Sequence, residues 1–110
     1  MIMHRKIPIY QNRIRKIDGS FSWIDHRLIT DGYVKSLSRD EIILYYFLIT
    51  VGDRNGISYY HPGTICKLLK LDLVCFAKAR DGLVSKDLIA YRHSDETYQV
   101  LSLREKVLVQ

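Results

Sequence analysis

The sequence contains no hydrophobic run long enough to cross a membrane. Its longest apolar stretch, IILYYFLITVG at 42–52, is bounded by charged residues on both sides and is much shorter than the roughly 20 residues that span a bilayer. The first residues, MIMHRKIPIYQNRIRKIDG, are basic but lack the apolar block and the small-residue cleavage site of a signal peptide. We therefore expect a cytoplasmic protein with no membrane partner.

Motifs for catalysis are also missing. The chain has no Walker-type Gly-rich loop, no HExxH, no GxSxG and no closely spaced Ser, His and Asp. DRNG at 53–56 resembles the beginning of a calcium loop, but ISYYHPGT follows without the required carboxylate, so a turn is favoured. Four histidines occur singly: His4, His26, His61 and His93. We expect no enzymatic activity, no small-molecule substrate, no cofactor and no metal site.

Cysteine is scarce as well, with only Cys66 and Cys75 present. The two lie nine residues apart within one predicted helical hairpin, and neither a CxxC pair nor a converging pair of histidines accompanies them. A reduced thiol buried as a small apolar side chain is therefore favoured over a disulfide or a metal site.

Acidic residues are rare at one end of the chain. The net charge is +5, and the first 18 residues hold five Lys or Arg against the single Asp18. A locally basic segment on a mixed-charge domain is typical of a protein that binds a polyanion, but a solvated basic tail has the same composition. Composition leaves both interpretations open.

The pattern of the 110 residues divides the chain into three segments, and this length fits one domain with one compact core. Residues 1–20 alternate weakly, contain Pro8 and end in DGS, which predicts an extended or partly ordered basic arm. Residues 21–103 form the expected domain, and residues 104–110 form a short amphipathic tail.

The clearest helix signal lies in SLSRDEIILYYFLITVGDRNG. Ser38 and Glu41 have the spacing of a capping box, and GDRNG ends the helix. Apolar residues occur nearly all round it, so we expect it at the centre of the core. A less regular helix is expected before it, capped by Ser22 or Asp25 and interrupted by Gly32.

A strand and a short helix are expected next. ISYYH at 57–61 is β-branched and aromatic, as in a strand. Pro62 suits the first turn of a helix because its missing N–H is not needed there. In TICKLLKL the spacing of Ile65, Leu68 and Leu69 predicts the inner face of this helix.

The remaining pattern predicts one more helix and a hairpin. Asp72 caps the segment LVCFAKARDGLVSKD, in which Gly82 is a local weakness because glycine disfavours helix. Residues 88–92 and 98–103 alternate on either side of a polar HSDET turn, which predicts a β-hairpin.

This order of elements resembles the winged helix-turn-helix domains of bacterial plasmid and phage replication initiators and related small DNA-binding proteins. The resemblance rests on LSRDEIILYYFLI, HPGTICKLLKL, DLVCFAKARDGLVSKDLI and LIAYRHSDETYQVLSL, and covers about residues 22–103. It implies an α+β, mainly α fold of three to four helices with a C-terminal β-hairpin wing. It also implies DNA binding in replication, in transcription regulation or in a mobile element.

Individual residues match this pattern in type. Ile65, Cys66 and Leu69 match the first helix of the motif, which implies that Cys66 fills the small buried position where the two helices touch. Asp87 stands where the family favours Gly. Either Asp87 adopts the left-handed backbone conformation, which Asp tolerates, or this corner is built differently.

The outward face of the predicted recognition helix carries little charge. Lys78 is the only obvious partner for phosphate or guanine on it, whereas Asp72 and Asp81 repel phosphate unless they accept from a cytosine amino group. Apolar Val74 and Ala77 suit thymine methyl groups, and basic groups elsewhere would anchor the DNA backbone. The resulting candidate DNA-binding residues are Lys67, Lys70, Leu73, Val74, Ala77, Lys78, Arg92, His93, Arg13, Arg15 and Lys16.

A second interpretation remains open. The uncharged patch of Leu73, Val74 and Ala77 also suits a protein partner, so the same fold is expected to serve as an interaction or dimerisation module if it does not bind duplex DNA.

Overall fold

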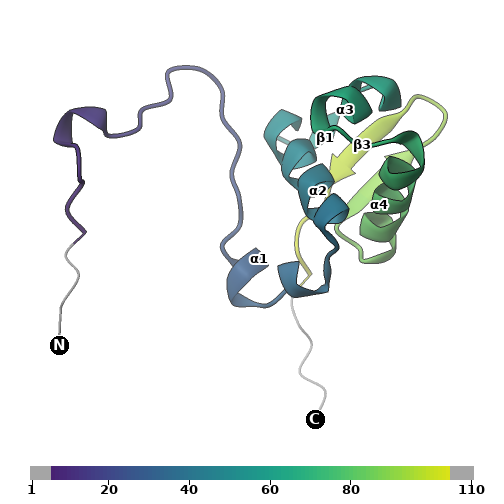
Figure 1. Ribbon diagram of the computed structural model, residues 1–110, viewed down its shortest axis with the longest axis horizontal. Helices are drawn as coiled ribbons and strands as arrows, with labels where there is room; N and C mark the ends of the chain where they lie inside the picture. Colours follow the sequence, from purple (N-terminus) through teal and green to yellow (C-terminus); the bar gives the residue numbers. More distant parts are fainter. Residues whose placement is uncertain (1–5, 105–110) are drawn as a thin grey trace, which may run out of the picture.

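The computed structural model describes residues 6–104 and shows a folded body with a long N-terminal arm (Figure 1). The described residues form an α+β, mainly helical fold with four α-helices and one small antiparallel sheet. Most of the predicted tail 104–110 lies outside the described residues. In chain order the elements are the 3-10 helix η1 (Gln11–Arg13), α1 (Arg27–Thr30), the 3-10 helix η2 (Val34–Ser36), α2 (Arg39–Val51), β1 (Ile57–Ser58), α3 (Pro62–Leu69), α4 (Leu73–Ser85), β2 (Ile89–Arg92) and β3 (Thr97–Val100).

Helix α2 begins at the predicted capping box. The Ser38 hydroxyl accepts a hydrogen bond from the Glu41 N–H at 3.2 Å, and the Glu41 carboxylate accepts from the Ser38 N–H at 2.7 Å. The carboxylate also accepts from Lys86 Nζ at 2.8 and 3.0 Å, beyond the end of α4. One buried carboxylate thus closes the first turn of α2 and ties it to α4.

Helix α2 lies at the centre of the core, as expected, but it is not buried on every side. Leu44 and Leu48 are fully buried, but Ile42, Ile43 and Tyr46 are 37%, 40% and 60% exposed. The apolar pattern overestimated the burial because the sheet and α4 cover only one side of the helix.

The segment before α2 is irregular, as the sequence predicts. Asp25 accepts from the Arg27 N–H at 2.9 Å at the start of α1, whereas the Ser22 hydroxyl donates to the Thr50 carbonyl at 3.0 Å and caps nothing. The chain then bends at Gly32, whose φ of 80° suits glycine. The expected single helix is therefore divided into α1 and η2.

The predicted strand at 57–61 is much shorter in the structure. Only Ile57 and Ser58 pair with β3. His61 then adopts the N-cap position of α3, where its Nδ1 accepts from the Gly63 N–H at 3.0 Å, and Pro62 is the first helical residue. The strand is short because His61, the last residue of the predicted strand 57–61, caps α3 instead of pairing with β3.

Helix α4 packs on α2, on α3 and on β2 of the sheet, whose strand order is β1-β3-β2. Ile65, Phe76 and Leu83 from α3 and α4 are buried in one core with Tyr98 of β3. Cys66 is half-buried against this core. Among the described residues both cysteines are free thiols.

The inner face predicted for α3 needs one correction. Leu68 is 60% exposed, while Ile65 is fully buried and Leu69 is half-buried. Among the described elements, α3 packs extensively only on α4, so only one of its faces is covered. Leu68 therefore belongs to the outer surface.

The hairpin of β2 and β3 is slightly shorter than predicted, with Tyr91 opposite Tyr98 and Arg92 opposite Thr97. Asp87, just before β2, has a φ of 62°. This confirms the left-handed conformation as the solution at this corner. The carboxylate of Asp87 also forms an ion pair with Arg104.

The N-terminal arm departs from the body on the side away from α3 and α4 (Figure 1). Residues 6–18 are exposed throughout. The radius of gyration is 16.9 Å, compared with about 13 Å for a compact chain of about 100 residues. No helix among residues 6–104 is long and apolar enough to cross a membrane.

Candidate nucleic-acid interface

The turn between α3 and α4 is built by two local features. Lys70 ends α3 in the left-handed conformation, with φ 58° and ψ 42°, and the Leu71 N–H donates back to the Cys66 carbonyl at 3.0 Å. Asp72 then caps α4, because its carboxylate accepts from the Cys75 N–H at 2.7 Å. The two helices are thus joined by a short corner, residues 70–72, which these hydrogen bonds hold in place.

Three exposed lysines surround this corner. Lys67 lies in the last turn of α3, Lys70 at the corner and Lys78 one and a half turns into α4. None of them forms an ion pair with any residue in 6–104. Their charge is therefore available to an anionic partner.

The same two helices also expose apolar side chains near this corner. Leu68, Leu73 and Val74 are 60%, 62% and 78% exposed. Ala77, predicted to face outward, is half-buried. We call the surface made by Lys67, Lys70, Lys78, Leu68, Leu73 and Val74 the corner face.

One acidic group interrupts the corner face. Asp72 stands at the N-terminus of α4, where the helix dipole favours an anion, and hydrogen bonds from the Cys75 N–H hold its pKa below its usual value. Its negative charge partly offsets the neighbouring lysines. Asp81, further along α4, is exposed and is bound by Arg80 at 3.1 Å.

The hairpin contributes less charge than its sequence suggests. Arg92 makes a two-pronged ion pair with Asp95, at 2.9 and 2.8 Å, and also donates to the Thr97 hydroxyl at 3.3 Å. The guanidinium and the Thr97 hydroxyl hold the pKa of Asp95 far below its usual value. Arg92 is therefore neutralised within the hairpin.

His93 and Arg80 support the hairpin rather than extend its charge. The His93 ring meets the Tyr91 ring edge-on at 4.6 Å. The Arg80 guanidinium also contacts Tyr91, 4.8 Å from the ring centre, and the Arg80 side chain is largely buried. These stacked groups fix the hairpin against α4.

The basic residues of the arm lie far from the corner face. Arg13 is in η1, Arg15 and Lys16 follow it, and all three are exposed. Figure 1 shows the arm on one side of the body and α3, α4 and the hairpin on the other. The structure thus brings together Lys67, Lys70, Leu73, Val74 and Lys78, but not the arm residues.

Sequence reasoning missed two features of this region. Leu68 was assigned to the core because its spacing suits an inner face, and only the packing of α3 shows it on the surface. The pairing of Arg92 with Asp95 had a signal in the sequence, since the two stand three residues apart across a turn.

Searches against protein-family models, curated proteins and solved structures found no match to this chain. Within the described residues no group of three or more His, Cys, Asp or Glu side chains is arranged to hold a metal ion.

Proposed function

We propose that this protein is a non-enzymatic DNA-binding protein of the winged-helix type, with the corner face as its main contact with duplex DNA. The order of α2, β1, α3, α4, β2 and β3 supports this fold assignment. In such domains α4 is the recognition helix and the hairpin is the wing. Replication or transcription control suits the proposal equally well.

The observation that carries the proposal is the group of unpaired lysines on the corner face. Lys67, Lys70 and Lys78 are exposed on two helices joined by a tight corner, so their ammonium groups are available to neighbouring phosphates. Phosphate contacts supply much of the affinity of such complexes. Leu73 and Val74 would meet thymine methyl groups or sugars in the groove.

Arg92 and the arm are secondary in this proposal. Arg92 must give up Asp95 before it can bind phosphate. Arg13, Arg15 and Lys16 can reach the same duplex only if the arm changes direction. His93 and the half-buried Ala77 contribute shape rather than charge.

A protein partner is the second candidate for the corner face. The 78% exposure of Val74 beside Leu68 and Leu73 favours it, because exposed apolar patches commonly mark protein contacts. Asp72 also favours it, since a carboxylate at the start of α4 repels phosphate.

One substitution separates the two candidates. Val74→Lys adds a cation to the corner face, so it should tighten duplex binding several-fold if this face meets DNA. The measurement is fluorescence anisotropy of a labelled duplex titrated with the full chain at about 50 mM salt. Unchanged binding, or no binding by the unaltered chain, would overturn the DNA proposal and leave the protein partner, whereas weaker binding would show that Val74 itself contacts the duplex.

A further inference from the structure

We propose that the arm of one copy of this chain docks in a groove on the body of a second copy, so that two chains exchange arms reciprocally. We call residues 6–18 the arm and residues 19–25 the root. The proposal concerns a surface remote from the corner face and does not depend on DNA binding.

The arm is too apolar to be a solvated tail. Ile7, Ile9, Tyr10, Ile14 and Ile17 are 61%, 92%, 70%, 58% and 47% exposed. Segments that remain free in solution are typically poor in aromatic and β-branched residues, because such residues gain free energy when they leave water. Five of them along thirteen residues indicate that the arm is buried in a complex.

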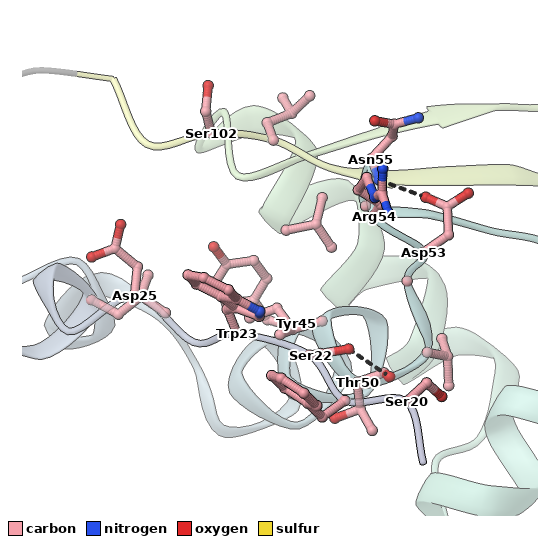
Figure 2. A pocket seen from close by; sticks show the side chains of 18 of the residues that line it. Ser20, Ser22, Trp23, Asp25, Tyr45, Thr50, Asp53, Arg54, Asn55 and Ser102 are labelled. Carbon is pink, nitrogen blue, oxygen red and sulfur yellow. Dashed lines mark hydrogen bonds between the residues drawn. The ribbon is translucent and has the colours of Figure 1, made fainter. Parts of the chain in front are cut away.

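The root, unlike the arm, is held on the body. The Ser22 hydroxyl donates to the carbonyl of Thr50, at the C-terminal end of α2 (Figure 2). Phe21 and Trp23 line the same region and are 61% and 85% exposed. The arm therefore leaves the body from a fixed position that is itself apolar.

A groove begins where the arm leaves. The root forms one wall, and the 52–56 turn and residues 100–103 form the other. Tyr45 of α2 lies between them (Figure 2), and Ile49 also lines the groove. Its volume is about 1220 Å³, above the roughly 300–1,000 Å³ typical of small-molecule pockets. An open groove of this size suits an extended segment of polypeptide.

One wall of the groove also carries a free backbone donor just beyond the end of β3. The Val100 N–H donates to the Gly56 carbonyl at 2.8 Å and the Leu101 N–H donates to the Leu88 carbonyl at 3.0 Å. The next amide, that of Ser102, has no backbone hydrogen bond within residues 6–104. A backbone carbonyl of an extended segment in the groove would satisfy this amide, as in other complexes where an extended peptide is bound through its main chain, and the alternation of Ile7 and Ile9 is typical of an extended segment.

The arm of a second copy can enter the groove more easily than the chain's own arm. The arm runs away from the body (Figure 1), so it would have to reverse its direction to enter its own groove. A two-fold axis near the root places each arm in the other groove. A stable complex buries roughly 800 Å² of surface on each partner. In a closed two-fold pair each chain buries both its arm and its groove, so both surfaces contribute to this area.

The test uses the full chain in sedimentation velocity experiments over about 1–100 μM. The unaltered chain is expected to dimerise in this range. An arm variant, Ile9→Asp with Ile14→Asp, and a groove variant, Ser102→Trp, should each weaken dimerisation at least tenfold. The matched controls, Leu68→Asp with Leu73→Asp on the corner face and Ser94→Trp in the hairpin turn, should leave it unchanged. All altered positions are exposed, and thermal melts verify that the body folds.

Mixing the two variants gives a second readout. Each variant alone has no intact pair of arm and groove, but a mixed dimer has one, formed by the arm of the Ser102→Trp chain and the groove of the arm variant. The mixture should therefore dimerise at lower concentration than either variant alone. A monomeric unaltered chain, arm variants that still dimerise, or a mixture no better than its components would each overturn the proposal.

Discussion

Gly82 is the residue on which the packing of α2 against α4 depends most directly. A Cβ atom at this position would lie 2.9 Å from Cδ of Glu41. The Glu41 carboxyl cannot move aside easily, since Ser38 and Lys86 both hold it by hydrogen bonds. The glycine that weakens α4 as an isolated helix therefore lets the two helices approach.

We predict that Gly82→Ala destabilises the protein by about 1–3 kcal/mol, as overpacking does in other cores, although alanine raises helix propensity by about 1 kcal/mol. Urea denaturation measures the change in the free energy of unfolding. In a Glu41→Ala background the same substitution should be neutral or stabilising. A stabilised Gly82→Ala single variant would contradict the proposed close approach.

Glu41 also makes stability depend on pH. Burial alone would raise the pKa of its carboxyl, but the hydrogen bonds from Lys86 and at Ser38 outweigh it and lower the pKa below the usual 4.5. The folded state therefore binds this proton less readily than the unfolded state, so the stabilisation is complete above about pH 4.5 and is lost as the pH falls through the lowered pKa.

The prediction is a loss of stability on acidification that is smaller in Glu41→Gln, because the amide does not titrate. Free energies of unfolding between pH 3 and 7 test it, and Asp81→Asn, at an exposed position on α4, serves as control. If Glu41→Gln and the unaltered chain lose stability in parallel, the Glu41 carboxylate is not the group responsible.

The capping role of Glu41 could be predicted from the sequence, whereas its contact with Lys86 could not. Ser38 and Glu41 lie three residues apart, and local geometry dictates their hydrogen bonds. Lys86 is 45 residues away. Its position, like the need for glycine at 82, depends on how α4 crosses α2.

At the scale of elements, the residues at which helices begin were the features that the sequence predicted best, because caps and turns depend on local residues. Asp72 begins α4 and Pro62 begins α3 as predicted, because both effects are local. The length of β1 and the exposed faces of α2 and α3 were not predictable, because they depend on which partner each element meets. The exposed Leu68 of the corner face belongs to this second group.

Asp72 both caps α4 and carries a negative charge, and two substitutions distinguish these two roles. Asp72→Ser retains an N-cap hydroxyl and removes the carboxylate beside Lys70. We predict that it keeps the free energy of unfolding within about 0.5 kcal/mol and tightens duplex DNA binding. Asp72→Ala, which removes the cap as well, should cost about 1 kcal/mol of stability.

Anisotropy titrations and urea denaturation of both variants test this prediction. Equal DNA affinity of the unaltered chain and Asp72→Ser would show that the start of α4 does not approach phosphate. That outcome would favour a protein partner for the corner face.

At the scale of the whole molecule, two surfaces lie on opposite sides of one small body. The corner face gathers three unpaired lysines from α3 and α4, and the root and groove lie where the arm departs (Figure 1). The sequence indicated a basic arm and one domain. It did not indicate that the arm points away from α4, because the direction of an arm depends on the few contacts of its root.

This separation predicts which basic residues govern DNA binding. The corner variant Lys67→Ala, Lys70→Gly, Lys78→Ala removes three charges from one face, with glycine at 70 because the backbone there is left-handed. The control variant Lys35→Ala, Arg39→Ala, Arg54→Ala removes three exposed charges elsewhere. Both variants lower the net charge by the same amount, so a difference in their DNA affinity shows that the position of the charges matters.

The most direct measurement is the dependence of duplex DNA affinity on salt for the unaltered chain and these two variants. Each lost phosphate contact reduces the slope of log affinity against log salt by about 0.9. The corner variant should therefore lose roughly two to three units of slope, and the control variant should lose much less than one. Equal slopes for the two variants, or no duplex binding by the unaltered chain at about 50 mM salt, would contradict the proposed DNA-binding face.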